Sequence, residues 1–339
     1  MLQFYFNPWN DLALASGDAH YTPPASARQM ADELQRPMEA FVLPSLRERL
    51  PAATEEAVWG WSPLARTLLQ DRGVTALPTA EQVAEYRAVS SRQTAVSLLQ
   101  RLRREWPEAF ADGGGLVGES RWCRTEAEVA EAISAYGGRA MLKAPWSGSG
   151  RGVKPVTSTL NSQLSTFNAS PWVRRTLRMQ GGVEVEPYYD KVQDFAMEFW
   201  ADGGRVTYEG LSLFGTTAAG VYAGNLVASE EEKERRLARH LDLALLHQLQ
   251  ERLEVLLSDQ IVPAWYTGPL GVDMMVVHPP CFIHKSSFSL HPFIELNLRM
   301  TMGWVACRLA AMLPERQTGY FRIAFEEGHY KALFGVNEA

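Results

Sequence analysis

The sequence has few cysteines, no long apolar run and no excess of basic residues. Its three cysteines, Cys123, Cys281 and Cys307, are odd in number and widely spaced. They predict neither a disulfide framework nor a CxxC metal pair, and they favour a reducing compartment. No stretch of about 18 apolar residues occurs, so no transmembrane helix is expected.

The charge balance argues against a protein that mainly binds polyanions. The chain has 33 basic and 39 acidic residues, and its formal net charge is −6. Proteins that mainly bind nucleic acid or an anionic membrane usually carry a basic surface. We therefore expect neither nucleic acid nor a membrane as a partner.

The composition is that of a globular protein. Of the 339 residues, 46% are hydrophobic and 21% are charged, and this length predicts two or three domains. The first residues, MLQFYFNPWND, lack the basic region of a signal peptide and include the charged Asp11. We interpret them as the first buried strand of a cytoplasmic protein.

The first 88 residues predict a small parallel α/β domain. Strand-like runs at 3–6, 39–44, 57–61 and 74–77 alternate with helical patterns at 25–34, 63–72 and 79–86. Ligands of such domains bind at the carboxyl ends of the strands. The loop after the first strand is therefore a candidate substrate site; its polar residues are Asn7, Asn10, Asp11, His20 and Tyr21. The alternative is a long structural loop.

The rest of the chain mixes helices with antiparallel strands. Helical patterns at 91–106 and 125–136 precede a strand at 139–145. From Gly182 onward, strands of period two follow one another, which is typical of an antiparallel sheet. A charged helix over 230–257 and strands at 271–277 and 291–299 come next, and Thr301 is a suitable N-cap for a helix over 302–312.

A loop rich in glycine and serine follows the strand that carries Lys143. In KAPWSGSGRGV (143–153), small residues let backbone N–H groups approach an anion, and the lysine adds a positive charge. This composition suits a phosphate site, although the P-loop pattern is absent. A flexible hairpin tip is the alternative.

Polar side chains share one face of the strand IELNLR (294–299). Because side chains alternate along a strand, Glu295, Asn297 and Arg299 point to the same side. Asp273 lies in the preceding strand, within the apolar run LGVDMMVV. If the two strands pair, carboxylate and amide oxygens of the kind that Mg²⁺ prefers converge. A solvated sheet face is the alternative.

The segment VEVEPYYDKVQDF (183–195) alternates apolar residues with Glu184 and Glu186 and then reaches Pro187. A strand that leaves one lobe through a proline suits an interlobe hinge, whose free backbone groups can bind an adenine edge. Asp194 follows a little further along the chain, and its carboxylate can accept hydrogen bonds from ribose hydroxyls. A plain acidic strand end is the alternative.

Taken in order, these motifs resemble the ATP-grasp superfamily of carboxylate–amine ligases, which includes D-alanine–D-alanine ligase, biotin carboxylase and glutathione synthetase. The resemblance covers about residues 89–313. It implies a small N-terminal parallel α/β (pre-ATP-grasp) domain followed by a two-lobed ATP-grasp fold with antiparallel sheets. The implied division is 1–88 for the first domain, 89–188 for the lobe with the phosphate loop, 189–313 for the lobe with the metal site, and 314–339 for a tail.

The resemblance also implies a role for each motif residue. Toward ATP, Lys143 would contact the phosphates, and the flap over the β and γ phosphates would consist of Ser147, Gly148, Ser149 and Gly150. Glu186 and Tyr188 would lie at the adenine, and Asp194 at the ribose. Where family members usually have another lysine, about fifty residues before Lys143, this sequence has Arg92, which can bind phosphate as well.

The metal and the reaction follow from the same resemblance. Asp273, Glu295 and Asn297 would hold Mg²⁺, and Arg299, with Lys143, would act on the transferred phosphate. The implied activity is an ADP-forming ligase that activates a small carboxylic acid as an acyl phosphate for attack by an amine. A phosphotransferase on the same scaffold and a nucleotide-binding protein without turnover are the alternatives. The sequence leaves a homodimer open and does not name the acid or the amine.

Overall fold

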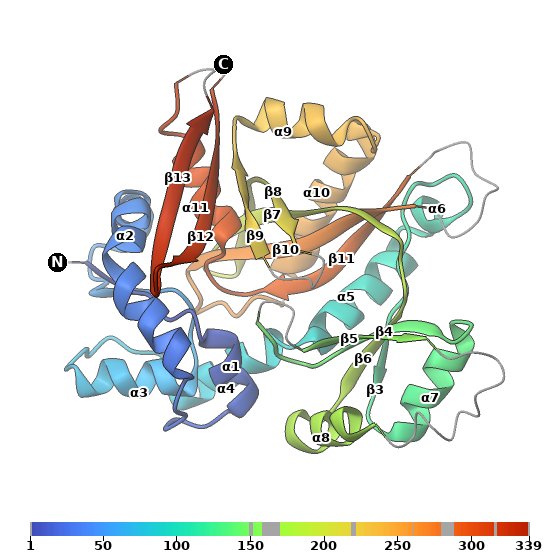
Figure 1. The fold of residues 1–339 in the computed structure, drawn as a ribbon, viewed down its shortest axis with the longest axis horizontal. Coiled ribbons are helices and arrows are strands. Elements are labelled where there is room, and N and C mark those ends of the chain that lie inside the picture. Colours follow the sequence, from blue (N-terminus) through green and yellow to red (C-terminus); the bar gives the residue numbers. More distant parts are fainter. Residues whose placement is uncertain are drawn as a thin grey trace.

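Three sheets form the framework of the protein (Figure 1). The computed structural model describes residues 2–148, 152–157, 170–217, 222–259, 261–278, 288–314 and 317–337. Within them, a parallel pair of strands precedes an antiparallel sheet of four strands and another of seven. The predicted fold class, a small parallel α/β unit followed by two antiparallel lobes, is therefore confirmed.

The N-terminal unit is mostly helical. Its two parallel strands are β1 (Gln3–Tyr5) and β2 (Glu56–Val58). Its helices are α1 (Asn10–Ser16), α2 (Ala25–Arg49), α3 (Pro63–Asp71) and α4 (Ala80–Val89). Thr79 begins α4 with a reciprocal capping box to Gln82, a sequence signal that marks the start of a helix.

Two predicted strands of this unit are wrong. Residues 39–44 lie inside α2, where Leu34, Met38, Val42 and Leu46 are buried at intervals of four residues. That spacing forms one apolar face of a helix and outweighs the two prolines that the helix contains. Residues 74–77 form no strand either, so only two strands pair in the described part of this unit.

The sheet of four strands forms the first lobe. Its order is β3 (Arg121–Cys123), β6 (Val183–Pro187), β4 (Arg139–Lys143) and β5 (Val153–Thr157). Helices α7 (Glu126–Ala135) and α8 (Pro171–Gln180) pack on it, and α5 (Arg92–Glu105) with the short α6 (Pro107–Phe110) leads into it from the N-terminal unit. This lobe is at the lower right of Figure 1.

The sheet of seven strands forms the second lobe. Its order is β11 (Ser289–Asn297), β10 (Gly268–Val277), β7 (Lys191–Asp202), β8 (Arg205–Thr216), β9 (Tyr222–Val227), β12 (Thr318–Glu326) and β13 (His329–Asn337). Helices α10 (Leu243–Ser258) and α11 (Met302–Ala310) pack on it. Thr301 accepts the N–H of Trp304 and begins α11 as predicted.

The predicted helix over 230–257 is interrupted. It forms α9 (Glu230–Leu237) and α10, and Asp242 caps the second helix by accepting the N–H of Ala244. Aspartate is a common N-cap residue. Inside a continuous amphipathic pattern, however, it does not stand out as the start of a second helix.

The segment predicted as a C-terminal tail belongs to the large sheet. Strand β12 pairs with β9 and with β13, and the hairpin tip contacts α2, where Glu33 accepts the backbone N–H of Tyr330 and pairs with His329. The predicted division of the chain at residue 313 stays a prediction, but the hairpin is part of the fold.

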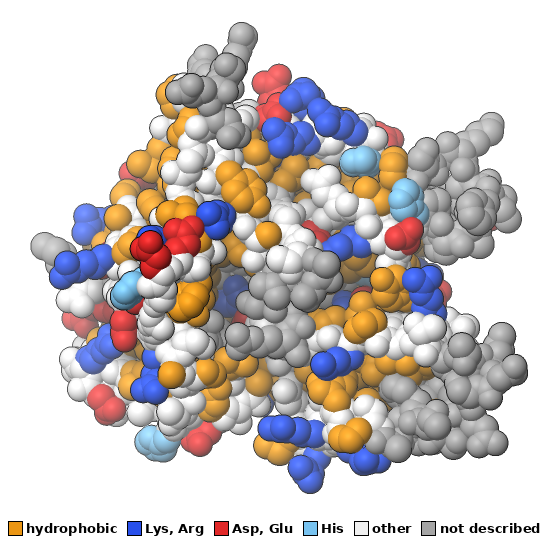
Figure 2. Space-filling view, in the orientation of Figure 1, with side chains coloured by type: hydrophobic (Ala, Val, Ile, Leu, Met, Phe, Trp, Pro, Cys, Tyr) orange, Lys and Arg blue, Asp and Glu red, His pale blue; other side chains and the backbone are white. Residues whose placement is uncertain are grey.

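The surface agrees with the moderate net charge. On the face shown in Figure 2, acidic and basic side chains are interspersed with apolar ones. Within the described residues, no helix is long and apolar enough to cross a membrane.

The first prediction tests whether the hairpin stabilises the fold. Phe321 of β12 is fully buried and its ring packs edge-on against Phe41 of α2, with centroids 5.6 Å apart. We expect Phe321→Ala to lower the free energy of unfolding by about 3–5 kcal/mol, because it leaves a cavity between these elements. Urea denaturation measures the change. The control is Phe325→Ala, whose ring is 59% exposed and which should cost under about 1 kcal/mol; equal losses would contradict the prediction.

Candidate active site

A cavity of about 1030 Å³ is lined by residues of both antiparallel sheets and of the N-terminal unit. It gathers most of the residues that the sequence singled out. Those on its lining are Asn10, Asp11, Arg92, Lys143, Ser147, Gly148, Glu186, Tyr188, Asp194, Asp273, Glu295, Asn297 and Arg299.

Three of the predicted substrate residues, Asn7, Tyr21 and the exposed His20, do not line this cavity. Asn7 is fully buried, and its side chain donates to the backbone oxygen of Gly60 and accepts the N–H of the same residue, at 2.9 and 3.2 Å. It thus fixes the loop after β1 instead of facing the cavity. Tyr21 packs against the apolar cluster of the N-terminal unit. Ser149 and Gly150 lie outside the described residues.

Lys143, at the end of β4, is surrounded by carboxylates. Its Nζ lies 2.8 Å from Glu186 Oε2 and 3.7 Å from Glu184 Oε1, and all three side chains are buried. Burial opposes the charge of the lysine, but the two glutamates outweigh it and raise the pKa of Lys143. Burial and the neighbouring Glu184 raise the pKa of Glu186. The arrangement keeps the ammonium charged inside the protein.

Arg92, the first residue of α5, connects the two lobes. Its Nη1 donates to the backbone oxygen of Ala144 and to Ser147 Oγ, at 2.7 and 2.6 Å. Its Nη2 lies 2.6 Å from Glu295 Oε2. The side chain is only 4% exposed, and its Nε has no partner among the described atoms. The guanidinium therefore ties the start of the glycine–serine loop to strand β11.

The predicted metal residues share one face of two paired strands. Asp273 of β10 pairs with Glu295 of β11, and Gly271 pairs with Asn297. Burial, and then the charge of Glu295, raise the pKa of Asp273 to about 7. Two carboxylates and an amide in adjacent rows present oxygen ligands of the type that binds a hard divalent cation. Among the described residues, no three His, Cys, Asp or Glu side chains form a metal cluster, because the third donor here is an amide.

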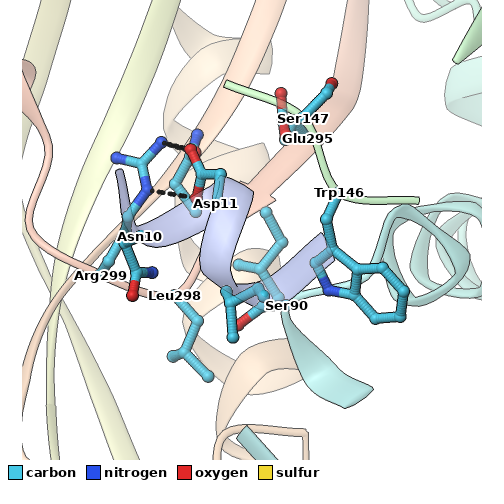
Figure 3. A pocket seen from close by; sticks show the side chains of 11 residues that line it. Asn10, Asp11, Ser90, Trp146, Ser147, Glu295, Leu298 and Arg299 are labelled. Carbon is cyan, nitrogen blue, oxygen red and sulfur yellow. Dashed lines mark hydrogen bonds and ion pairs between the residues drawn. The ribbon is translucent and has the colours of Figure 1, made fainter. Parts of the chain in front are cut away.

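Arg299 is fixed between the second lobe and α1. Its Nε and Nη2 each donate to one carboxylate oxygen of Asp11 at 3.0 Å, and Nη2 also donates to Asn297 Oδ1 at 2.8 Å. Figure 3 shows Asp11 and Arg299 facing each other, with Ser147 beside Glu295 across the pocket. The bidentate pair fixes the direction of the guanidinium. It brings α1 into the site, a segment that the sequence predicted as part of a loop and that is helical from Asn10 to Ser16.

The predicted nucleotide residues lie at the other end of the cavity. Tyr188, 38% exposed, is covered by the guanidinium of Arg139 at 4.2 Å from its ring. Asp194 accepts a hydrogen bond from Thr216 at 2.8 Å and pairs with Lys191 at 2.5 Å. Glu186, predicted at an adenine, is instead engaged with Lys143, so its side chain is not free in this structure.

Sequence reasoning missed Glu198. This residue of β7 lines the cavity and is only 1% exposed. Thr301 donates to its Oε2 at 2.7 Å, and burial raises the pKa of Glu198 to about 8. The signal was available, because Glu198 interrupts the apolar run FAMEFW as Asp273 interrupts its own strand.

Comparison with solved structures finds several of similar shape. N5-carboxyaminoimidazole synthetase from Staphylococcus aureus, complexed with ADP, has 10% sequence identity and a TM-score of 0.49, over 96% of this chain and 83% of that chain. N5-carboxyaminoimidazole ribonucleotide synthetase from Thermus thermophilus has 15% identity and a TM-score of 0.47, over 95% and 83%. The biotin carboxylase domain dimer of Hydrogenobacter thermophilus 2-oxoglutarate carboxylase, complexed with MgADP, has 14% sequence identity and a TM-score of 0.48, over 81% of this chain and 66% of that chain.

A scan of the sequence against protein-family models and a search of curated proteins find no match.

The second prediction concerns the pH dependence of stability. The pKa of Glu198 is raised from 4.5 to about 8 in the folded protein, so the folded state holds a proton that the unfolded state releases. The stability that this proton provides is present below about pH 4.5 and is lost as the pH rises toward 8. Because glutamine does not ionise, the Glu198→Gln variant does not lose this stability as the pH rises. We expect its stability advantage over the wild type to grow by about 2–4 kcal/mol between pH 5 and pH 8.

Urea unfolding at pH 5, 6, 7 and 8 measures this difference. The control is Glu105→Gln, which changes a carboxylate that is about half exposed and should show no such trend. A stability difference between Glu198→Gln and the wild type that stays constant with pH would contradict the prediction.

Proposed function

We propose that this protein is an ATP-dependent, ADP-forming ligase that activates a small carboxylic acid as an acyl phosphate for attack by an amine. One observation carries the proposal: Lys143 of the first lobe and the Asp273, Glu295 and Asn297 set of the second lobe line the same cavity. This pairing of a phosphate-binding cation with a metal-type oxygen set, across two lobes, is the arrangement that phosphoryl transfer needs.

The cations of the site would serve the nucleotide phosphates. Lys143 is buried and charged, and Arg92 holds the first residues of the glycine–serine loop through Ser147. Positive groups that are fixed before the reaction stabilise developing negative charge without reorganisation. Tyr188 and Asp194, farther along the cavity, would contact the adenine and the ribose.

The oxygen set fits Mg²⁺. Asp273 and Glu295 lie opposite each other on paired strands. Burial, and then the charge of Glu295, raise the pKa of Asp273, and a divalent cation would stabilise the charged form of this carboxylate. Mg²⁺ normally uses few protein ligands and keeps substrate phosphates and water as the others. When bound, it would neutralise phosphate charge and orient the phosphates.

Arg299 would act where the carboxylic acid and the phosphate meet. Its pKa is raised, since Asp11 and Glu295 outweigh the effect of burial, so it stays charged. In the first step the substrate carboxylate attacks the γ-phosphoryl group and ADP leaves; in the second, the amine displaces phosphate and an amide forms. The protein mainly holds the reactants in position and neutralises charge.

The third prediction tests the oxygen set. We expect Asp273→Asn and Glu295→Gln each to reduce Mg-ATP turnover by at least about 10²-fold, because each removes a charge at the reacting phosphates. Both variants should still unfold in a cooperative thermal transition, at a lower temperature for Glu295→Gln because it also removes the partner of the buried Arg92. The control is Glu326→Gln, an exposed carboxylate of the hairpin, which should keep wild-type turnover. Wild-type rates in both site variants would reject the metal assignment.

The fourth prediction separates a ligase from a phosphotransferase. A thermal-shift screen of Mg-ATP with pools of amino acids and small carboxylic acids identifies substrates by their added stabilisation. With an active pair, a ligase releases one phosphate per amide, and the release requires both the acid and the amine. Phosphate retained on an acceptor as a stable ester would overturn the ligase and support the phosphotransferase. ATP binding without product from any pair would favour a binding protein.

A further inference from the structure

The large cavity extends beyond the predicted metal residues, and its far end has a polar floor. Side chains alternate along β7, so Asp194, Ala196 and Glu198 point to the same side. Ala196 pairs with Asp273, and Glu198 pairs with Gly271. Each step of two residues advances about 7 Å. Glu198 therefore lies one step past the Asp273 row, on the side away from Asp194.

Other buried polar groups adjoin Glu198 on the same floor. Asn225 of β9 donates to Ser212 Oγ of β8 at 2.7 Å, and Tyr222 donates to Asn225. Ser212 pairs with Ala196 across the strands, and these side chains line the cavity with Glu198. Gly303 of α11 closes this side, since a Cβ there would lie 2.0 Å from Glu198 Oε1 and 2.3 Å from Ser212 Oγ. The polar groups are therefore held tightly in place.

Glu198 lacks the partner that a buried carboxylate needs. Its side chain accepts a hydrogen bond from the Thr301 hydroxyl, and no ion pair to it occurs within the part of the chain that the structure describes. A buried charge without a cation is strongly unfavourable, which is why burial raises its pKa. A bound cation would replace the proton as the neutralising charge.

Apolar residues line the same cavity. They are Ile323, Phe325 and Tyr330 from the β12–β13 hairpin, with Met30 and Trp59 from the N-terminal unit. Trp59 lies near the Glu198 end, because its backbone oxygen accepts the N–H of Met300, the neighbour of Thr301. The rings of Phe325 and Tyr330 pack together with centroids 4.7 Å apart. A cavity that combines a buried carboxylate with an apolar lining favours a ligand with a positive head and an apolar substituent.

We propose that this end of the cavity binds the amine substrate, a primary amine with an apolar or aromatic substituent, with its ammonium group on Glu198 and its substituent against the β12–β13 hairpin. The assignment rests on the proposed function. It places the amine beyond the phosphate region, on the side opposite the nucleotide. After the Glu198 carboxylate takes one proton from the ammonium group, the neutral amine can approach an acyl group held near Arg299.

The test measures binding of probe amines directly. Isobutylamine and phenethylamine are titrated into the wild-type protein, with and without a non-hydrolysable ATP analogue and Mg²⁺, and followed by ligand-observed NMR. Isobutanol, 2-phenylethanol and 3-phenylpropionate are the neutral and anionic controls. We expect both amines to bind, the neutral and anionic analogues to bind at least 10-fold more weakly, and Glu198→Gln to weaken amine binding at least 10-fold.

Binding of the ATP analogue provides a measurement that is independent of the amine site. Glu198→Gln should bind the ATP analogue within about twofold of the wild type, which a general loss of structure would not allow. Tyr330→Ala should weaken phenethylamine more than isobutylamine, because it removes part of the apolar wall. In a reconstituted reaction, Glu198→Gln should raise KM for the amine and leave KM for Mg-ATP unchanged.

Each outcome decides between the two proposals. If the nucleotide binds but the amines do not, or if Glu198→Gln leaves amine binding unchanged, the amine site is wrong and the proposed ligase is unaffected. If the analogue does not bind the wild type with Mg²⁺, the proposed function fails, and with it the identification of this end as a substrate site.

Discussion

The buried guanidinium of Arg92 is the contact on which the geometry of the site depends. It joins the first residue of α5 to the loop after β4 and to Glu295 of β11, so one side chain links elements of the two antiparallel sheets. Removing one partner of a buried pair leaves the other charge uncompensated, at a typical cost of about 3–5 kcal/mol. Through this one group, Ser147 is held close to Glu295.

The same logic applies to the other cations of the cavity. Lys143 pairs with Glu186, and Arg299 pairs with Asp11, so each positive group has a carboxylate of its own. A protein of net charge −6 can thus hold three cations around one cavity, with Lys143 and Arg92 buried. The carboxylates also orient those cations before any phosphate arrives, which reduces the reorganisation that binding requires.

Local pattern was enough to find much of the site. Alternation along a strand placed Glu295, Asn297 and Arg299 on one face, and an acid within an apolar run singled out Asp273. The same reasoning failed for residues 39–44, because an apolar run of that length fits a buried helix face as well as a strand. It also omitted Glu198, although the signal was the same as for Asp273.

Other features depend on contacts between distant parts of the chain. Arg299 and Asp11 are 288 residues apart, so no local pattern could show that the loop after β1 reaches the second lobe. For the same reason Asn7 and Asn10 looked equivalent in the sequence. One fixes the loop through Gly60, and the other lines the cavity.

The contacts between the β12–β13 hairpin and α2 also have a consequence for folding. The amide of Gln29 donates to the backbone oxygen of Gly328, 299 residues later, and Phe321 covers Phe41. Contacts of such long sequence separation form late, because closing so large a loop has a high entropic cost. During synthesis, the part of α2 that contacts this hairpin therefore stays exposed until nearly 300 further residues have been translated, whereas the part that packs on β1 is covered early. Chaperone binding to the nascent chain would be most needed over this interval.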